Sequence, residues 1–181
     1  MKHFLLILPL AILITACGSN VTPEKKTIGE TRFTTAYAKS YGAHYASRGI
    51  AQNVIDFDLY SANIDLDSTH HIVGTGSNLY ISDIFVPTAE TTLQPESYRS
   101  DTTGSDYTFL PGVDYEGNIS GAYLLRINDG SLSGYTVFND GTFTLTQDGD
   151  TTQVLFTLHY TEGNNIQRTY EAEFRGIIVY E

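Results

Sequence analysis

The chain has 181 residues, of which 41% are hydrophobic, enough for one domain with a hydrophobic core. It contains 10 Lys and Arg and 21 Asp and Glu, which gives a formal net charge of -11. No basic cluster interrupts the acidic remainder, so nucleic acid is disfavoured as a partner. One cysteine cannot form an internal disulfide, whereas 13 Tyr, 9 Phe and 16 Gly are typical of a strand-rich protein with many turns.

The beginning of the chain has the layout of an export signal. A short basic start precedes an apolar run over residues 4–14 and two small residues. This run has about ten residues, whereas a membrane-spanning helix needs roughly 20. Residues 13–17, Leu-Ile-Thr-Ala-Cys, resemble the lipobox of bacterial lipoproteins. The resemblance implies that residues 1–16 are a signal peptide and that Cys17 becomes the lipid-bearing first residue, a palmitate carrier. An ordinary signal peptide with an incidental cysteine is the alternative.

Residues 17–32 are polar and aperiodic, which predicts a flexible tether between the lipid at Cys17 and a single domain over residues 33–181. Acyl chains would hold the protein to a membrane without spanning it. Gly18 stands where some inner-membrane lipoproteins have a retention Asp, so we expect the bacterial outer membrane. Its periplasmic or surface face stays open, because Glu24 alone resembles the acidic surface-export run of Bacteroidota lipoproteins.

The next part of the chain alternates apolar and polar residues with the period of a half-buried strand. The clearest segments are 54–60, 153–160 and 168–175. The alternation predicts that the following residues face the core: Ile55, Phe57, Leu59, Val154, Phe156, Leu158, Tyr160, Tyr170, Ala172 and Phe174. Further candidate strands are 78–86, 107–110, 122–127 and 134–138, with Pro87, Pro95 and Pro111 in the connections.

Turn residues divide the last third of the chain into short segments. Asp140-Gly141, Asp148-Gly149 and residues 163–165 tolerate positive φ, which predicts three consecutive hairpins. We therefore predict an all-β antiparallel fold of about 8 to 10 strands, as a sandwich or a closed, calycin-like barrel. The sandwich is favoured because residues 78–86 look apolar on both faces, whereas a wide ligand-holding barrel would have polar interior positions.

Four short segments resemble small all-β cell-envelope lipoproteins of Bacteroidota. They are YGAHY at 41–45, GTGSNLY at 74–80, YTFLPG at 107–112 and GTFTL at 141–145. The resemblance extends over most of residues 33–180 and is mainly structural. It implies an envelope protein, and it brings no catalytic residue or substrate with it.

Possible catalytic and metal sites have simpler explanations. His70 and His71 are neighbours, so on a strand they would face opposite ways, and we expect a solvated loop. Asp65 and Asp67 resemble the start of a calcium loop, but the glycine and the final Glu of that motif are missing at 70 and 76. We predict no metal site and no cofactor.

Asp56 and Asp58 share a strand face, and we predict that this face is exposed to solvent. A glycosidase would need two such carboxylates to converge on a cleft. No Gly-x-Ser-x-Gly motif occurs, and Cys17 is assigned to lipid, so we predict no catalytic residue and favour a protein that is not an enzyme.

Tyr37, Tyr41 and Tyr45 are the strongest binding candidates. Their even spacing puts them on one face of an unbroken strand, where they would stack on sugar rings, meet an envelope protein or cover the core. We expect a lipid-anchored, non-enzymatic binding or structural domain. The alternative is a glycan-binding accessory protein or a weak glycan hydrolase.

Overall fold

The structure is a computed structural model that describes residues 27–69 and 71–181. Cys17, the predicted signal peptide at 1–16 and His70 lie outside the described residues. Strand β1 (Thr27–Gly42) begins inside the predicted tether and pairs in parallel with β14 (Ile166–Gly176), which supplies its backbone hydrogen-bond partners. Residues 27–32 therefore belong to a strand and not to the tether.

The protein is all-β, as predicted, with a single 3-10 turn, η1 (Ala46–Arg48), in the described residues. The remaining strands are β2 (Asn53–Ser61), β3 (Ile64–Leu66), β4 (Ile72–Gly74), β5 (Gly76–Val86), β6 (Ser97–Ser100), β7 (Thr108–Phe109), β8 (Val113–Tyr115), β9 (Asn118–Ser120), β10 (Ala122–Asn128), β11 (Ser131–Val137), β12 (Asp140–Asp148), β13 (Thr151–Glu162) and β15 (Ile178–Tyr180).

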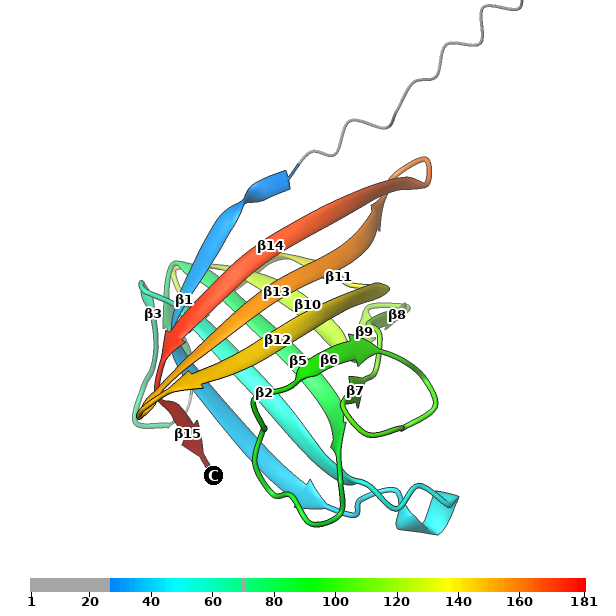
Figure 1. Ribbon diagram of the computed structural model, residues 1–181. Coiled ribbons are helices and arrows are strands. Elements are labelled where there is room, and N and C mark those ends of the chain that lie inside the picture. Colours follow the sequence, from blue (N-terminus) through cyan, green and yellow to red (C-terminus); the bar gives the residue numbers. More distant parts are fainter. Residues whose placement is uncertain (1–26, 70) are drawn as a thin grey trace, which may run out of the picture.

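Among the described residues, eight strands close into a mixed barrel in the order β5-β2-β1-β14-β13-β12-β6-β7, and β7 returns to β5 (Figure 1). The pairs β1–β14 and β6–β7 are parallel, so the path differs from an up-and-down barrel of the calycin type. β10 and β11 extend the sheet sideways from the first half of β5, and β15 lies parallel to the second half of β1.

The closed barrel, given above as the alternative, is the observed architecture, and the preference for a sandwich was wrong. The preference for a sandwich came from β5, which looks apolar on both faces because its core-facing residues have odd numbers before residue 82 and even numbers after residue 83. The register between β2 and β5 shifts at Ser82 and Asp83, and Asp83 has a φ of 55°. This bulge changes the alternation, so that Leu79 and Ile81 before it and Ile84 and Val86 after it all belong to one core.

The barrel interior is filled by aromatic side chains. The ring of Phe143 stacks on Tyr98 at 4.4 Å and lies 5.6 Å from Phe156 and 6.4 Å from Phe57. All four rings are at most 2% exposed. The interior is therefore a packed core, as in other small barrels, and a ligand site has to be sought on the outside of the wall.

The alternating segments behave as predicted, since every residue assigned to the core in 54–60, 153–160 and 168–175 is buried. Two of the three predicted hairpins are present, β12–β13 and β13–β14. The hairpin predicted at Asp140-Gly141 is wrong, because these residues begin β12 opposite Leu158 and His159, while β11 pairs with β10.

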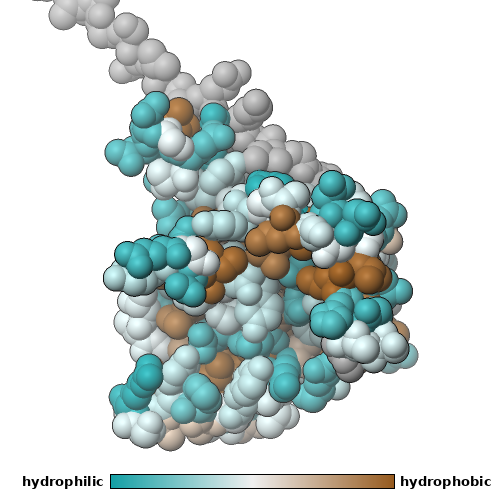
Figure 2. Space-filling model, turned by 180° about the vertical axis from the view of Figure 1, so that it is seen from behind, coloured by the Kyte–Doolittle hydropathy of each residue, from teal (hydrophilic) through white to brown (hydrophobic). Residues whose placement is uncertain are grey.

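Within the described part of the chain, no helix is long and apolar enough to cross a membrane. On the face turned to the viewer in Figure 2, hydrophobic patches alternate with hydrophilic surface, and no single apolar area extends over that whole face. Residues 27–69 and 71–181 thus form a barrel with one main core and a mixed outer surface on this side.

Candidate functional site

Three neighbouring strands of the wall and the adjoining strand β10 carry a row of directly opposed outward residues. Tyr37 on β1 is opposite Asp58 on β2, Asp58 is opposite Tyr80 on β5, and Tyr80 is opposite Tyr123 on β10. The rings of Tyr80 and Tyr123 lie 5.2 Å apart. Residues opposed in this way have side chains on the same face, so the pairing builds a polar aromatic surface on the barrel wall.

Asp56 lies beside this row at the β5 bulge. Its Oδ1 accepts a hydrogen bond from the backbone N–H of Asp83 at 3.0 Å, and its Oδ2 accepts one from the Tyr80 hydroxyl at 2.5 Å. Asp83 in turn accepts a hydrogen bond from the Tyr45 hydroxyl at 2.7 Å, which raises the pKa of Tyr45 to about 12. Asp56 is thus held in place by the bulge and by a tyrosine on the next strand.

Asp58 is held in a similar way by two side chains. Its carboxylate accepts hydrogen bonds from the Tyr60 hydroxyl and from the side-chain amide of Asn78. Burial raises the pKa of the Asp58 carboxyl above its ordinary value, while the bonds from Tyr60 and Asn78 oppose that change. Burial also raises the pKa values of Tyr60 and Tyr80, so both phenols remain neutral donors at physiological pH.

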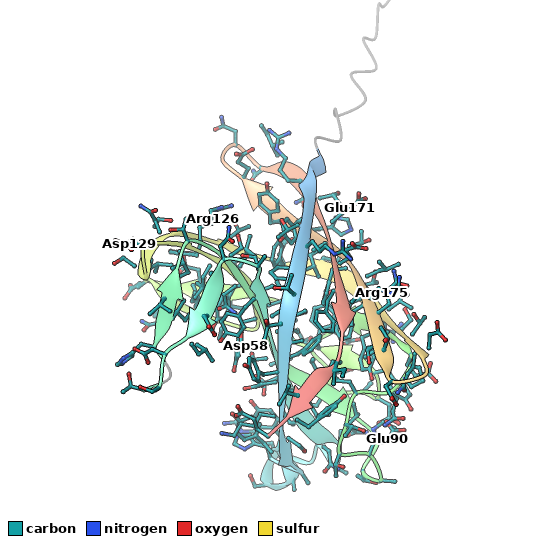
Figure 3. The ribbon with its side chains drawn as sticks, turned by 90° about the vertical axis from the view of Figure 1, so that its left-hand side faces the viewer. Asp58, Glu90, Arg126, Asp129, Glu171 and Arg175 are labelled. Atoms are coloured by element: carbon teal, nitrogen blue, oxygen red, sulfur yellow. The ribbon has the colours of Figure 1, made fainter. Side chains whose placement is uncertain are left out.

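These side chains line a pocket of about 300 Å³ on the outside of the wall. Strands β1, β2 and β5 form its base, Leu66 of β3 and Ile72 of β4 lie at one side, and the C-terminal residue Glu181 contributes as well. In Figure 3 Asp58 lies beside the middle of β1. The full lining is Tyr37, Ala38, Lys39, Tyr41, Asp56, Asp58, Tyr60, Leu66, Ile72, Tyr80 and Glu181.

Two members of the predicted tyrosine stripe, Tyr37 and Tyr41, line this pocket. Tyr41 is 46% exposed, and the ring of Tyr37 meets Tyr60 edge to face at 6.1 Å. Tyr45 does not share their strand, because β1 ends at Gly42, and its ring lies 6.0 Å from Phe85. The stripe therefore divides into two pocket residues and one residue that supports the bulge.

Asp56 and Asp58 are on the outer face of β2, as predicted. They are not simply exposed to solvent, however, because both line a pocket and accept hydrogen bonds there. Sequence reasoning missed Tyr60 and Tyr80. The even spacing of Asp56, Asp58 and Tyr60 was a usable signal for Tyr60. The position of Tyr80 depends on the pairing of β5 with β2, which no local pattern specifies.

A second hollow of about 450 Å³ lies near Arg126, Tyr135 and Glu162. Its polar groups bind one another or nearby side chains: Arg126 donates to Thr136 at 2.8 Å, Tyr135 donates to Asp114 at 2.7 Å, and Arg168 pairs with Glu162 at 2.7 Å. Glu162 is thus paired with a cation, whereas Asp56 and Asp58 of the tyrosine–aspartate pocket accept hydrogen bonds from neutral groups only in the described part of the chain, which leaves that pocket better suited to a ligand despite its smaller volume.

The segment with calcium-like spacing forms a local turn. Oδ1 of Asp67 accepts hydrogen bonds from the backbone N–H groups of Thr69 and His71 at 2.7 and 3.0 Å and from the Thr69 hydroxyl. The hydrogen bond from the Thr69 side chain is the main reason why the pKa of Asp67 falls to about 2. Across the described residues, no three His, Cys, Asp or Glu side chains are grouped to hold a metal ion.

The pocket holds more negative charge than its own cations balance. Asp56, Asp58 and Glu181 face a single lining cation, Lys39, and none of these acids forms an ion pair with any Lys or Arg of residues 27–69 and 71–181. The arrangement is thus able to accept hydrogen bonds and to pack against flat or cationic groups.

Comparisons with protein families, with curated proteins and with solved structures find no match for this chain.

Proposed function

We propose that the protein is a lipid-anchored envelope protein that binds a small ligand, without chemistry, in the tyrosine–aspartate pocket of its barrel wall. One observation carries the proposal: four tyrosines and two aspartates from three neighbouring strands converge on one cavity of about 300 Å³. Ligand sites typically have about 300 to 1,000 Å³ and combine apolar walls with a few fixed polar groups. The hydrogen bonds of Asp56 and Asp58 provide such fixed groups.

The position of the pocket along β1 supports a display role. Tyr37 and Tyr41 lie in the second half of this 16-residue strand, and Tyr37 comes ten residues after Thr27. At about 3.3 Å per residue this places Tyr37 at most about 33 Å along the strand from its start. If the chain is anchored through Cys17, this length of β1 is available to hold the pocket at a distance from the lipid surface.

The anchor itself is proposed on the lipobox resemblance, and an outer-membrane location on Gly18. Replacing Cys17 with Ala removes the sulfur that accepts the diacylglyceryl group, so labelled palmitate should no longer be incorporated and the signal should no longer be cleaved. Palmitate that persists on the Cys17→Ala protein would contradict the anchor. The resemblance to envelope lipoproteins of Bacteroidota fits this proposal.

Ligand binding is tested by backbone-amide NMR with neutral oligosaccharides, carboxylates and small amines as separate probes. We expect at least one class to shift the amides of β1, β2 and β5 around the pocket. Tyr41→Ala should weaken that binding, whereas Tyr115→Ala, a change at a 71% exposed ring outside the pocket, should not. Absence of any shift at the pocket, or equal effects of the two variants, would overturn the proposal.

A second function, weak glycan hydrolysis, is favoured by the carboxylate pair. Asp56 and Asp58 are two residues apart on one strand face, so their α-carbons are separated by about 6.6 Å. A pair of carboxyl groups about 5 to 10 Å apart, one of them with a raised pKa, is the arrangement of glycosidases. If the protein releases sugar from an oligosaccharide, both Asp56→Asn and Asp58→Asn should abolish the release.

A further inference from the structure

We infer that the tyrosine–aspartate pocket selects an organic cation, a small molecule with a primary or quaternary ammonium group. This inference rests on the proposed binding function and adds the chemical class of the ligand. Its three supports are the unbalanced charge of the pocket, the hydrogen-bond donors already used at its base, and the rings at its edge.

The first support is charge. Asp56 and Asp58 are both partly buried, and the residues 27–69 and 71–181 supply neither of them with an ion-pair partner. Glu181 adds a third acid, against Lys39 as the one lining cation. A partly buried carboxylate has lost some of its hydration, so an incoming positive charge gains more here than at an exposed site. An anionic ligand would meet a net repulsion.

The second support is the hydrogen-bond inventory. The hydroxyl groups of Tyr60 and Tyr80 and the side-chain amide of Asn78 already donate to the two aspartates. Each carboxylate oxygen has a further lone pair to offer, so the base of the pocket presents acceptors. A primary ammonium has three donors and no acceptor, which matches that base. A sugar hydroxyl that needs an acceptor and a donor at the same point is matched less well.

The third support is aromatic. Tyr37 and Tyr41 flank the carboxylates, and the ammonium of Lys39 lies 5.6 Å from the centre of the Tyr41 ring. That separation is within the range of a cation–π contact, which extends to about 6 Å. The chain thus already places one ammonium group against a ring at the edge of the pocket. Lys39 is exposed, so it is able to move aside for a ligand.

The experiment compares two cations with a neutral molecule of the same shape. Choline and putrescine are titrated into the purified protein, and 3,3-dimethylbutan-1-ol, which replaces the nitrogen of choline by carbon, is the neutral control. Amide shifts around the pocket give the dissociation constants. We expect at least one cation to bind more tightly than the neutral control, and its advantage to shrink as salt is raised from 20 to 500 mM, as a screened charge interaction requires.

Three substitutions locate the effect. Tyr41→Leu keeps an apolar side chain but removes the ring, and a cation–π contact of about 0.5 to 2 kcal/mol corresponds to a loss of about 2- to 30-fold in affinity. Asp56→Asn should also weaken the cation. Lys39→Gln should instead raise the affinity for the cation, because the competing ammonium is removed. Lys39 is exposed, so Lys39→Gln should not destabilise the fold, and this variant still tests the inference if Asp56→Asn is unstable.

Matched controls separate local from general effects. Asp148→Asn removes the same charge from an exposed position at the β12–β13 turn, and it should leave cation binding unchanged. Equal binding of choline, putrescine and the neutral control would overturn the cation inference. So would a Lys39→Gln protein that binds the cations no better. If neutral oligosaccharides still shift the pocket amides in a Tyr41-dependent way, the binding function stands and only the ligand class is wrong.

Discussion

The hydroxyl of Tyr80 on β5 donates a 2.5 Å hydrogen bond to Oδ2 of Asp56 on β2, at the point where β5 bulges. Tyr80→Phe removes this donor and leaves a partly buried carboxylate with one partner fewer. A hydrogen bond to a charged group contributes about 1.5 to 3 kcal/mol, and the half-buried position of Tyr80 favours the lower end of that range for the loss in unfolding free energy. Urea denaturation measures it.

The matched control for this change is Tyr135→Phe. Tyr135 also donates to a carboxylate, Asp114, at 2.7 Å, but both residues are exposed. Water replaces such a bond readily, so we expect a loss below about 0.5 kcal/mol. Equal losses in the two variants would show that the Tyr80–Asp56 bond has no special role at the bulge.

Asp58 should make stability depend on pH. Burial raises the pKa of its carboxyl in the folded protein above the ordinary value of 3.8. A carboxyl with a raised folded pKa contributes stability that is complete below pH 3.8 and is lost as the pH rises through the folded value. Asp58→Asn removes this ionisation, so the stability of the variant relative to the native protein should increase from pH 3 toward pH 7.

This dependence is measured as the unfolding free energy of the Asp58→Asn protein minus that of the native protein at each pH, so that contributions of other acids cancel, and this difference should rise with pH. A difference that stays constant across the range would mean that the pKa of Asp58 is not raised by folding. A difference that falls with pH would mean that the hydrogen bonds from Tyr60 and Asn78 outweigh burial.

Gly141 should resist replacement, although it is not in a hairpin turn. Its φ is 149°, and a Cβ added there would lie 2.7 Å from the carbonyl oxygen of Thr157 and 2.8 Å from Cα of Leu158. Gly141→Val should therefore cost about 1 to 3 kcal/mol or more, since the neighbouring backbone of β13 has to move. Gly163→Ala is the control, because its added Cβ meets nothing within 4 Å. Similar melting temperatures for both variants would contradict the close approach.

The tyrosine stripe should show graded effects on melting. Tyr41→Ala should cost less than about 1 kcal/mol because the ring is 46% exposed. Tyr45→Ala should cost more, since it removes the hydrogen bond to Asp83 and the ring contact with Phe85. Phe156→Ala, which truncates a core side chain, should cost about 3 to 5 kcal/mol and is the reference for a buried ring. A Tyr41→Ala loss as large as that of Phe156→Ala would make Tyr41 a core residue.

Local pattern was sufficient for several strands and for part of the core. The alternation of Val154, Phe156 and Leu158 specifies which face of β13 is buried, because successive side chains of a strand point to opposite sides. The turn at Asp148-Gly149 was also predictable, since Gly149 has the positive φ of 59° that such turns need. These features depend on residues close together in the sequence.

The stripe and the third hairpin show where local pattern fails. Even spacing predicts that Tyr37 and Tyr45 share one strand face, but Gly42 has a φ of 58° and ends β1 between them. Asp140-Gly141 has the composition of a turn, yet the pairing of β12 with β13 takes these residues into a strand. The first case depends on the local conformation of one glycine, and the second on strand partners that are distant in the sequence.

Sequence alone determined that the described chain is all-β, which faces of β2, β13 and β14 are buried, and that Asp56 and Asp58 lie on the outer side of one strand. Tertiary structure decided that the sheet closes, because closure depends on the pairing of β7 with β5 and of β6 with β7. It also decided that Tyr80 meets Asp56, because the register between β2 and β5 is set by the bulge at Asp83 and by packing of the whole barrel.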